Sequence, residues 1–204
     1  MAFNCSKCNN KRHLFEPGKG WVKCECMNVI RANSIMSHSG FPNALWEIDS
    51  GSFKPGKDAN RNALAKGIVE IVNDYSKRPV FIYSDSPDKD RVSAIICRYI
   101  TIKHPEVQSI SFVTIDQLVQ RQFGKVYENQ SDVEPIDADI AVVSIGKEMT
   151  NKAHMNSLYS FLYDRILAEK FTIVSSFLPK NRIIQVYHKA VDDLMNKNFL
   201  FYSC

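Results

Sequence analysis

The stretch FIYSDSPDKDRVSAI, residues 81–95, decides how the rest of the chain is interpreted. It begins with β-branched and aromatic residues, passes through a polar loop rich in serine and aspartate, and ends in apolar residues at helical spacing. Runs of the first kind favour a buried strand, and apolar residues at helical spacing favour an amphipathic helix. The stretch therefore predicts a strand, a loop and a helix, in that order.

The same alternation of apolar strands and helices continues along the chain. The predicted strands are 79–83, 109–115, 139–145 and 171–177. The predicted helices are 59–76, 90–103, 116–124, 151–168 and 181–197. Apolar strands separated by helices favour a parallel sheet that is covered on both faces. We therefore predict an α/β domain with helices on both sides of one sheet.

Composition limits the class of protein further. The chain has 204 residues, 45% hydrophobic and 24% charged, which suits one globular domain with room for a small second one. It contains neither an apolar run long enough for a membrane span nor a signal peptide at residues 1–13, so we expect a cytoplasmic protein with reduced thiols. Residues 1–66 carry ten Lys/Arg against five Asp/Glu. This basic third predicts contact with nucleic acid or an acidic surface, and a merely solvated face is the alternative.

Four of the six cysteines lie close together near the N-terminus, as Cys5-x2-Cys8 and Cys24-x-Cys26. Two short hairpins that each supply two thiolates are typical of a tetrahedral zinc site, and the turn signal at 17–20 could bring the pairs together. His13 is a substitute ligand if one cysteine does not coordinate. We predict a structural Zn²⁺ site; a chance cluster of thiols is the alternative.

The order of these parts resembles a known family. A CxxC…CxC module, a helix over 27–39 that ends in Ser39-Gly40-Phe41-Pro42, and an α/β domain are similar to the replicative-helicase loaders of the DnaC/DnaI type from bacteria and phages. The resemblance implies a P-loop fold of the AAA+ type and a hexameric replicative helicase as partner, with single-stranded DNA as a further candidate. It divides the chain into a zinc-binding, helicase-interacting module (1–40), a linker (41–58) and an AAA+-like domain (59–204).

The phosphate loop departs from the pattern of that family. A working loop needs glycines, a lysine for the phosphates and a Ser/Thr for Mg²⁺. Here Asp90 stands where the lysine is required and Arg91 where the hydroxyl is required, while Lys89 is one residue out of register. The degenerate loop consists of Ser84, Asp85, Ser86, Pro87, Asp88, Lys89, Asp90 and Arg91.

Two further catalytic positions have also changed. The strand over 139–145 ends in Ser144-Ile145-Gly146 in place of two acidic residues, with Glu148 beyond the glycine. The next strand ends in Ser175-Ser176 and places Phe177 near the position of a polar γ-phosphate sensor. Three changes together predict a pseudo-ATPase with no catalytic residues. Arg165 and Arg182 are candidates for arginine fingers, and packing or surface roles are the favoured interpretation.

From these observations we expect a DNA replication accessory protein, a phage-type helicase loader or loader-like adaptor that binds the helicase without ATP hydrolysis. One alternative is an atypical loader ATPase that uses Lys89. Another is a zinc-dependent DNA-binding regulator in which Phe15, Trp21 and Phe41 stack on bases, although covering of the zinc site is the favoured role of these rings. A third is an unrelated doubly wound domain with an ordinary strand–helix loop.

Overall fold

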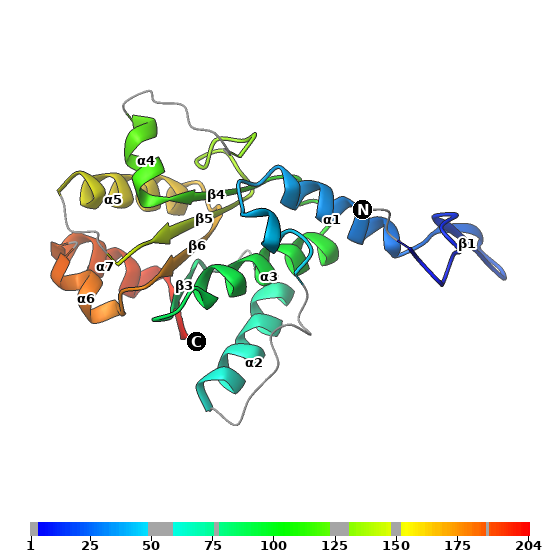
Figure 1. The fold of residues 1–204 in the computed structure, drawn as a ribbon, viewed down its shortest axis with the longest axis horizontal. Coiled ribbons are helices and arrows are strands. Elements are labelled where there is room, and N and C mark those ends of the chain that lie inside the picture. Colours follow the sequence, from blue (N-terminus) through cyan, green and yellow to red (C-terminus); the bar gives the residue numbers. More distant parts are fainter. Residues whose placement is uncertain (1–3, 49–58, 76–77, 123–130, 148–151, 187) are drawn as a thin grey trace.

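The computed structural model describes residues 4–48, 59–75, 78–122, 131–147, 152–186 and 188–204. A small hairpin module projects from one side of a larger α/β domain (Figure 1). The antiparallel hairpin consists of β1 (His13–Glu16) and β2 (Gly20–Lys23). Gly18 and Gly20 have φ angles of 86° and 79°, so the turn predicted at 17–20 uses glycine for left-handed backbone.

The main sheet has five parallel strands in the order β4-β5-β6-β3-β7. They are β3 (Val80–Tyr83), β4 (Ile110–Thr114), β5 (Ile140–Ile145), β6 (Phe171–Ser176) and β7 (Leu200–Ser203). The helices are α1 (Cys26–Ser37), α2 (Ala59–Asn73), α3 (Asp88–Lys103), α4 (Ile115–Gln122), α5 (Lys152–Leu167), α6 (Lys180–Val186) and α7 (His188–Asn198), with a short 3-10 helix at Asn43–Leu45. None of the described helices is long and apolar enough to cross a membrane.

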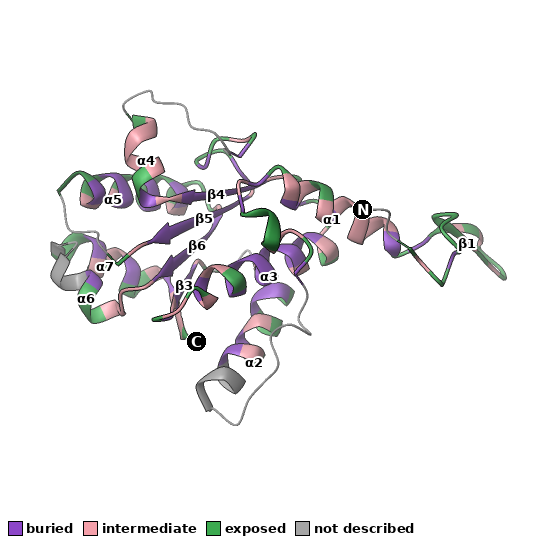
Figure 2. Cartoon of the chain, in the orientation of Figure 1, coloured by how far each residue is buried: buried purple, intermediate pink, exposed green. Residues whose placement is uncertain are grey.

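Helices cover both faces of this sheet, as the sequence predicts. All residues of β5 and β6 are buried, and neighbouring residues point into different layers of core (Figure 2). Ile173 packs in the layer that contains side chains of α2 and α3, whereas Val174 packs in the layer that contains side chains of α5 and α7. Buried on both sides, a parallel sheet of this kind needs the continuous apolar runs that the sequence shows.

The helix α1 joins the hairpin module to the α/β domain. Its Arg31 guanidinium donates to the Val107 carbonyl at 2.6 Å and also to the carbonyls of Thr101 and His104, near the C-terminal end of α3. The Thr101 carbonyl belongs to the last turn of α3, where carbonyls have no partner within the helix, and His104 and Val107 lie just beyond its end. Arg31 therefore caps α3 while it holds α1 in place.

The stretch Ser39-Gly40-Phe41-Pro42 ends this connection. Gly40 has a φ angle of 85°, which redirects the chain after α1. Phe41 is 3% exposed and stacks on Phe112 of β4 with ring centroids 4.4 Å apart. The Phe112 N–H also donates to the Ser39 carbonyl at 2.6 Å. The motif therefore fixes the end of α1 to the edge of the sheet, whereas the division of the chain at residues 40 and 58 stays a prediction.

Two features of the C-terminal region differ from the prediction. The single helix predicted over 181–197 is wrong, because α6 and α7 are separate helices, with residue 187 outside the described residues. The strand β7 is an addition that the sequence analysis missed; it pairs with β3 in parallel. The Tyr202 ring lies against Gly67 of α2, where a Cβ atom would collide with it. A four-residue strand gives too short a pattern to distinguish it from a loop.

Candidate functional site

Four cysteine thiols gather beside the hairpin, with their Sγ atoms all within 4.8 Å of one another. The Sγ atoms of Cys5 and Cys24 are 3.8 Å apart, and those of Cys8 and Cys26 are 3.6 Å apart. Sulfur ligands at about 2.3 Å from a tetrahedral ion lie about 3.8 Å from one another. The cluster therefore has the dimensions of a four-coordinate metal site, and its members are the four cysteines that the sequence predicts.

The backbone around each cysteine pair fixes this geometry. In the turn after Cys5, Asn9 and Asn10 adopt φ angles of 47° and 64°, a conformation that asparagine tolerates better than most residues. The Asn10 Oδ1 atom accepts a hydrogen bond from the Cys5 N–H at 2.7 Å. Cys26 is the first residue of α1, so one ligand belongs directly to the helix that joins the module to the domain. His13 begins β1 with an exposed side chain and is not part of the cluster.

The thiols differ in how readily they lose a proton. A hydrogen bond from the Cys8 backbone lowers the pKa of Cys5 to about 7, whereas burial raises the pKa of Cys26 to about 12. Thiolates, not thiols, ligate metal ions, so binding of an ion would release protons and would strengthen as the pH rises. The donor set and the spacing both fit a tetrahedral ion that prefers sulfur ligands.

The degenerate phosphate loop lies at the carboxyl ends of the central strands, where residues 84–87 connect β3 to α3 and residues 88–91, predicted as part of the loop, form the first turn of α3. Its backbone N–H groups bind groups of the chain itself: the Ser84 N–H donates to the Ser176 carbonyl at 3.1 Å, and the Ser86 N–H donates to the Ser84 Oγ at 3.3 Å. The Asp88 N–H donates to the Ser86 Oγ at 3.2 Å. A phosphate-binding loop works through N–H groups that point at the anion. Here two of these N–H groups donate to loop serine hydroxyls and a third donates to a carbonyl of β6.

Lys89 is the most deeply buried charged residue of this region, with 1% of its surface exposed. Its Nζ lies 2.8 and 2.9 Å from the two carboxylate oxygens of Asp90 and 2.5 Å from the Ser144 Oγ. It also lies 4.6 Å from the centroid of the Phe177 ring. Burial lowers the pKa of Lys89, and the Asp90 carboxylate opposes that effect. The Lys89 ammonium therefore already has three oxygen partners within the protein, two from Asp90 and one from Ser144.

Asp90 completes the arrangement by joining two strands to α3. Its carboxylate accepts a hydrogen bond from the Ser175 Oγ at 2.5 Å and one from the Ser144 Oγ at 3.2 Å. We call Lys89, Asp90, Ser144, Ser175 and Phe177 the Lys89 network. It brings together residues from the three degenerate motifs that the sequence analysis identified separately. Their mutual bonding was not predicted, and the only signal for it was that all three motifs lie at strand ends of one parallel sheet.

Other predicted residues lie outside this network. Asp85 and Arg91 are exposed, and Glu148 lies outside the described residues. Arg165 is fully buried and donates to the backbone carbonyls of Pro135, Ala138 and Phe171, so the expected packing role is confirmed and an arginine-finger role is not supported. Arg182 is exposed on α6.

The three aromatic residues near the cysteines have two different environments. Phe15 and Trp21 are 64% and 70% exposed, so the expectation that they cover the metal site is wrong. They are cross-strand neighbours on one face of the hairpin, and the opposite face supplies Leu14 to the cysteine cluster. Phe41 belongs to the α/β core, where it can neither cover the cluster nor stack on a base.

No family model matches this sequence, and no curated protein matches it. Solved structures do match the fold. A proposed primosome component from Streptococcus pyogenes serotype M3 superposes with a TM-score of 0.68 at 14% identity, over 85% of this chain and 94% of that one. The DnaC helicase loader gives 0.64 at 13% identity, over 79% of this chain and 99% of that one. DnaI gives 0.63 at 12% identity, over 81% and 95%. The chain therefore has the α/β fold that these proteins share, as predicted.

Proposed function

We propose that this protein is a DNA replication accessory factor, a phage-type helicase loader or loader-like adaptor, which binds a replicative helicase and acts without ATP hydrolysis. The general role is supported by the fold, which it has in common with the DnaC helicase loader and with the S. pyogenes protein. The absence of a nucleotide cycle is supported by the Lys89 network. The two parts of the proposal therefore rest on different observations.

The observation that carries the proposal is the pairing of Lys89 with Asp90. In a working phosphate loop the lysine contacts the phosphate oxygens of the nucleotide. Here a carboxylate of the same helix lies 2.8 Å from the ammonium, in the role that a phosphate would have. A triphosphate would have to displace this carboxylate and then remain close to it. A like charge at about 4 Å costs on the order of 4 kcal/mol at an effective dielectric near 20, which opposes nucleotide binding.

The metal-binding groups of an ATPase are also missing from the described part of this site. The strand β5 presents Ser144 at its end, where a carboxylate would hold Mg²⁺. The Ser144 hydroxyl already bonds Lys89 and Asp90. We infer that the site is a pseudo-ATPase site, in which an internal ion pair replaces nucleotide and metal.

For the cysteine cluster we propose Zn²⁺ with a structural role. Four thiolates leave no open position for a substrate water, so the ion would hold the module together and would not catalyse a reaction. Among its described residues, the module has almost no apolar core of its own beyond the cysteines and Leu14. The free energy of metal binding would therefore stabilise its fold.

The helicase contact is proposed for the groove between the module and the 3-10 helix. This groove has a volume of about 920 Å³, and its walls come from the cysteine turn, from α1 and from the segment around Trp46. Ile30 and Trp46 provide apolar surface, and Arg12 and Glu47 provide charges of both signs. Because Arg31 fixes α1 to α3, the groove has a fixed shape, which reduces the entropic cost of docking.

Co-elution with a hexameric replicative helicase tests the proposal directly. The purified protein should co-elute with its helicase to the same extent with and without ATP. A substitution in the groove, Ile30→Asp, should reduce the complex, whereas the exposed substitution Tyr163→Ala on α5 should leave it unchanged. Failure to bind any replicative helicase, or binding that requires ATP, would contradict it.

A further inference from the structure

One face of the hairpin has no structural task within the described residues. Along β1 and β2, side chains alternate between two faces, and the register pairs Phe15 with Trp21 and His13 with Lys23. We call the face with these four residues the aromatic face. All four are exposed. The rings of Phe15 and Trp21 form an edge-to-face pair with centroids 5.8 Å apart.

The aromatic face is not needed to shield the metal site. The other side of the hairpin, with Leu14, packs against the cysteines. The rings of Phe15 and Trp21 are 64% and 70% exposed, so most of their apolar surface is in contact with water. Exposed aromatic surface of this kind marks a contact with another molecule more often than a lone exposed side chain does.

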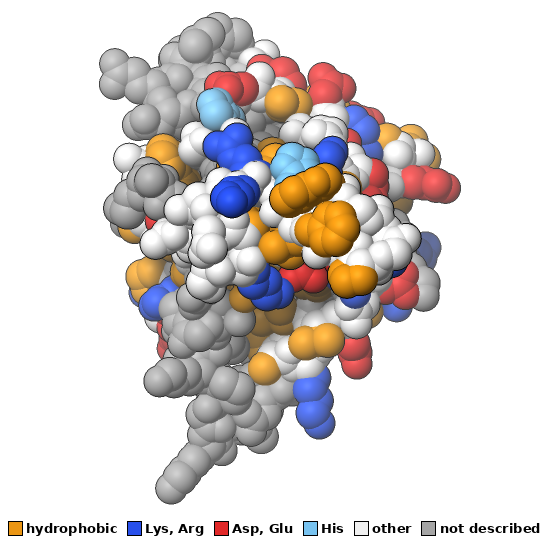
Figure 3. Space-filling model, turned by 90° about the vertical axis from the view of Figure 1, so that its right-hand side faces the viewer, with side chains coloured by type: hydrophobic (Ala, Val, Ile, Leu, Met, Phe, Trp, Pro, Cys, Tyr) orange, Lys and Arg blue, Asp and Glu red, His pale blue; other side chains and the backbone are white. Residues whose placement is uncertain are grey.

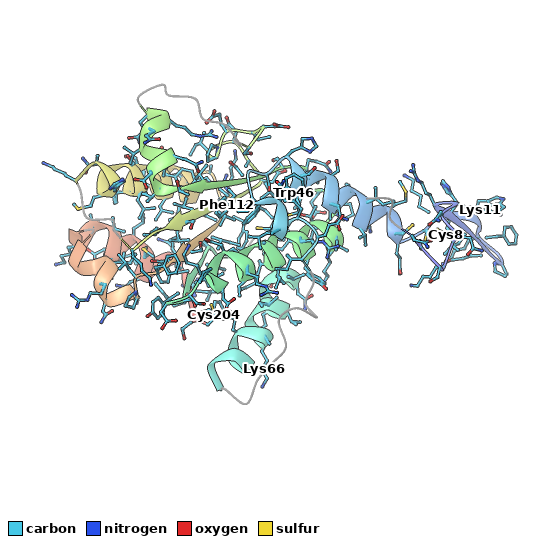
Figure 4. The ribbon with its side chains drawn as sticks, viewed as in Figure 1. Cys8, Lys11, Trp46, Lys66, Phe112 and Cys204 are labelled. Atoms are coloured by element: carbon cyan, nitrogen blue, oxygen red, sulfur yellow. The ribbon has the colours of Figure 1, made fainter. Side chains whose placement is uncertain are left out.

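Basic groups border this face. Two lysines of the module are paired, Lys19 with Glu16 at 3.1 Å and Lys7 with Glu25 at 2.8 Å. For Lys11 and Lys23 the described residues supply no carboxylate partner within ion-pair distance, and both are exposed. Figure 3 views this end of the molecule and shows hydrophobic side chains with a histidine and basic side chains beside them. In Figure 4 Lys11 extends from the module, whereas Cys8 lies at its junction with α1.

The charge of the metal site does not reverse this pattern. Four thiolates and a divalent ion would carry a net charge of −2, but Cys8, Cys24 and Cys26 are buried residues. Lys23 lies on the aromatic face, Lys11 lies just before β1, and both side chains are exposed. A ligand that binds the aromatic face therefore lies closer to these positive side chains than to the thiolates.

We propose that the aromatic face binds single-stranded nucleic acid. Such a strand combines flat apolar bases, which stack on exposed rings, with a phosphate backbone that pairs with lysine and arginine. A duplex is excluded as the preferred ligand because its bases already stack on each other. The contact needs no base-specific hydrogen bond, so it tolerates any sequence. It is distinct from the helicase contact proposed for the groove, because neither the four residues of the aromatic face nor Lys11 line that groove.

The fluorescence of Trp21 provides a direct test. The chain has two tryptophans, and Trp46 is partly buried with its Nε1 bonded to the Phe41 carbonyl at 2.7 Å. In a Trp46→Phe variant, titration with a poly-dT oligonucleotide of about 15 nucleotides should quench Trp21. The affinity should fall with salt with a logarithmic slope of about −1.4, since each of two single-strand phosphate contacts, at Lys11 and Lys23, contributes about −0.7.

Two variants make the test specific to the face. In the full chain, Phe15→Ala with Trp21→Ala should weaken binding of a labelled oligonucleotide by at least about tenfold, whereas Tyr163→Ala, a similarly exposed aromatic on α5, should have no effect. An unchanged metal content shows that the double variant is folded. The proposal is overturned if Trp21 is not quenched, if the double variant binds DNA normally, or if only an acidic peptide quenches Trp21. The helicase co-elution assay is unaffected by any of these results.

Discussion

The cysteine cluster and the Lys89 network are assembled over very different distances along the chain. The paired sulfurs of the cluster are 19 and 18 residues apart in sequence. Lys89 is 55 residues from Ser144, and Asp90 is 85 residues from Ser175. The first site depends on two local turns, whereas the second exists only after the parallel sheet has formed.

This difference predicts that substitutions in the two sites have different effects on stability. The module has few apolar contacts of its own, so removal of one ligand should affect it strongly and locally. The Lys89 network lies within a domain that has two large layers of buried apolar side chains. A change there should lower stability without destroying the fold.

Loss of the metal should have the largest effect. We expect Cys8→Ser, or a chelator, to unfold the hairpin, because metal binding in small modules of this kind contributes about 10–16 kcal/mol of apparent free energy. Limited trypsin digestion should then cleave at Lys11 and Lys23 while the α/β domain stays intact. Cys204→Ser is the matched control and should keep one metal ion per chain. An unchanged hairpin after chelation would contradict the metal assignment.

Removal of Asp90 should have the next largest effect. Asp90→Ala leaves Lys89 charged and buried without its partner, and we expect a loss of about 2–4 kcal/mol in the free energy of unfolding, at the lower end because Asp90 is 24% exposed. Urea unfolding measures the change.

Two companion variants sharpen this result. Adding Lys89→Met to Asp90→Ala should recover most of the loss, because no unpaired charge remains. Asp85→Ala changes an exposed aspartate of the same loop and should shift stability by no more than about 0.5 kcal/mol. If both single aspartate variants behave alike, the buried pair is not what stabilises this loop.

A smaller effect is expected where the two regions are joined. Arg31→Met removes three hydrogen bonds to backbone carbonyls at the end of α3, which should cost about 1–3 kcal/mol. Arg31→Lys should recover little of it, because one ammonium lacks the planar fork of the guanidinium. Arg91→Ala, on the exposed side of α3, is the control for urea unfolding. Equal stability of Arg31→Met and the wild type would remove the argument that α1 is held rigidly.

The smallest effect concerns pH. Burial lowers the pKa of Lys89 in the folded state. Between the folded-state pKa and the unfolded-state pKa, the folded chain has lost this proton while the unfolded chain still holds it. Stability from this group should therefore rise as the pH increases towards the ordinary lysine value of 10.5, and should be lost as the pH falls through the folded-state pKa.

The variant Lys89→Met isolates this contribution, because burial also raises the pKa of Tyr75 and Tyr202. The difference in unfolding free energy between wild type and variant should change in favour of the wild type as the pH rises towards the ordinary lysine value of 10.5. Parallel curves would show that Lys89 titrates as in the unfolded chain.

The sequence predicted those features that depend on local pattern. The four clustered cysteines are identified by spacing alone, and the strands β5 and β6 by continuous apolar runs that a buried parallel sheet requires. Lys89 and Asp90 were recognised only as misplaced motif residues, because their hydroxyl partners come from strands 54 to 85 residues further along the chain.

Exposure was the property that the sequence predicted least well. Phe15 and Trp21 were expected to cover the metal site, but strand alternation places them on the outer face and Leu14 on the inner one. Phe41 has the same chemical character and is buried, because Gly40 turns it towards Phe112. The sequence contains the alternation, but which face meets the cysteines is decided by the turns around Cys5 and Cys24.

The measurement that tests the central claim most directly is calorimetric titration of the protein with Mg²⁺–ATP, with an ATP-binding loader measured in parallel. If Asp90 holds Lys89 in place of a phosphate, no saturable binding should appear up to about 1 mM nucleotide. Saturable, Mg²⁺-dependent binding that Lys89→Met abolishes would show that the lysine still serves a nucleotide, and would contradict the account.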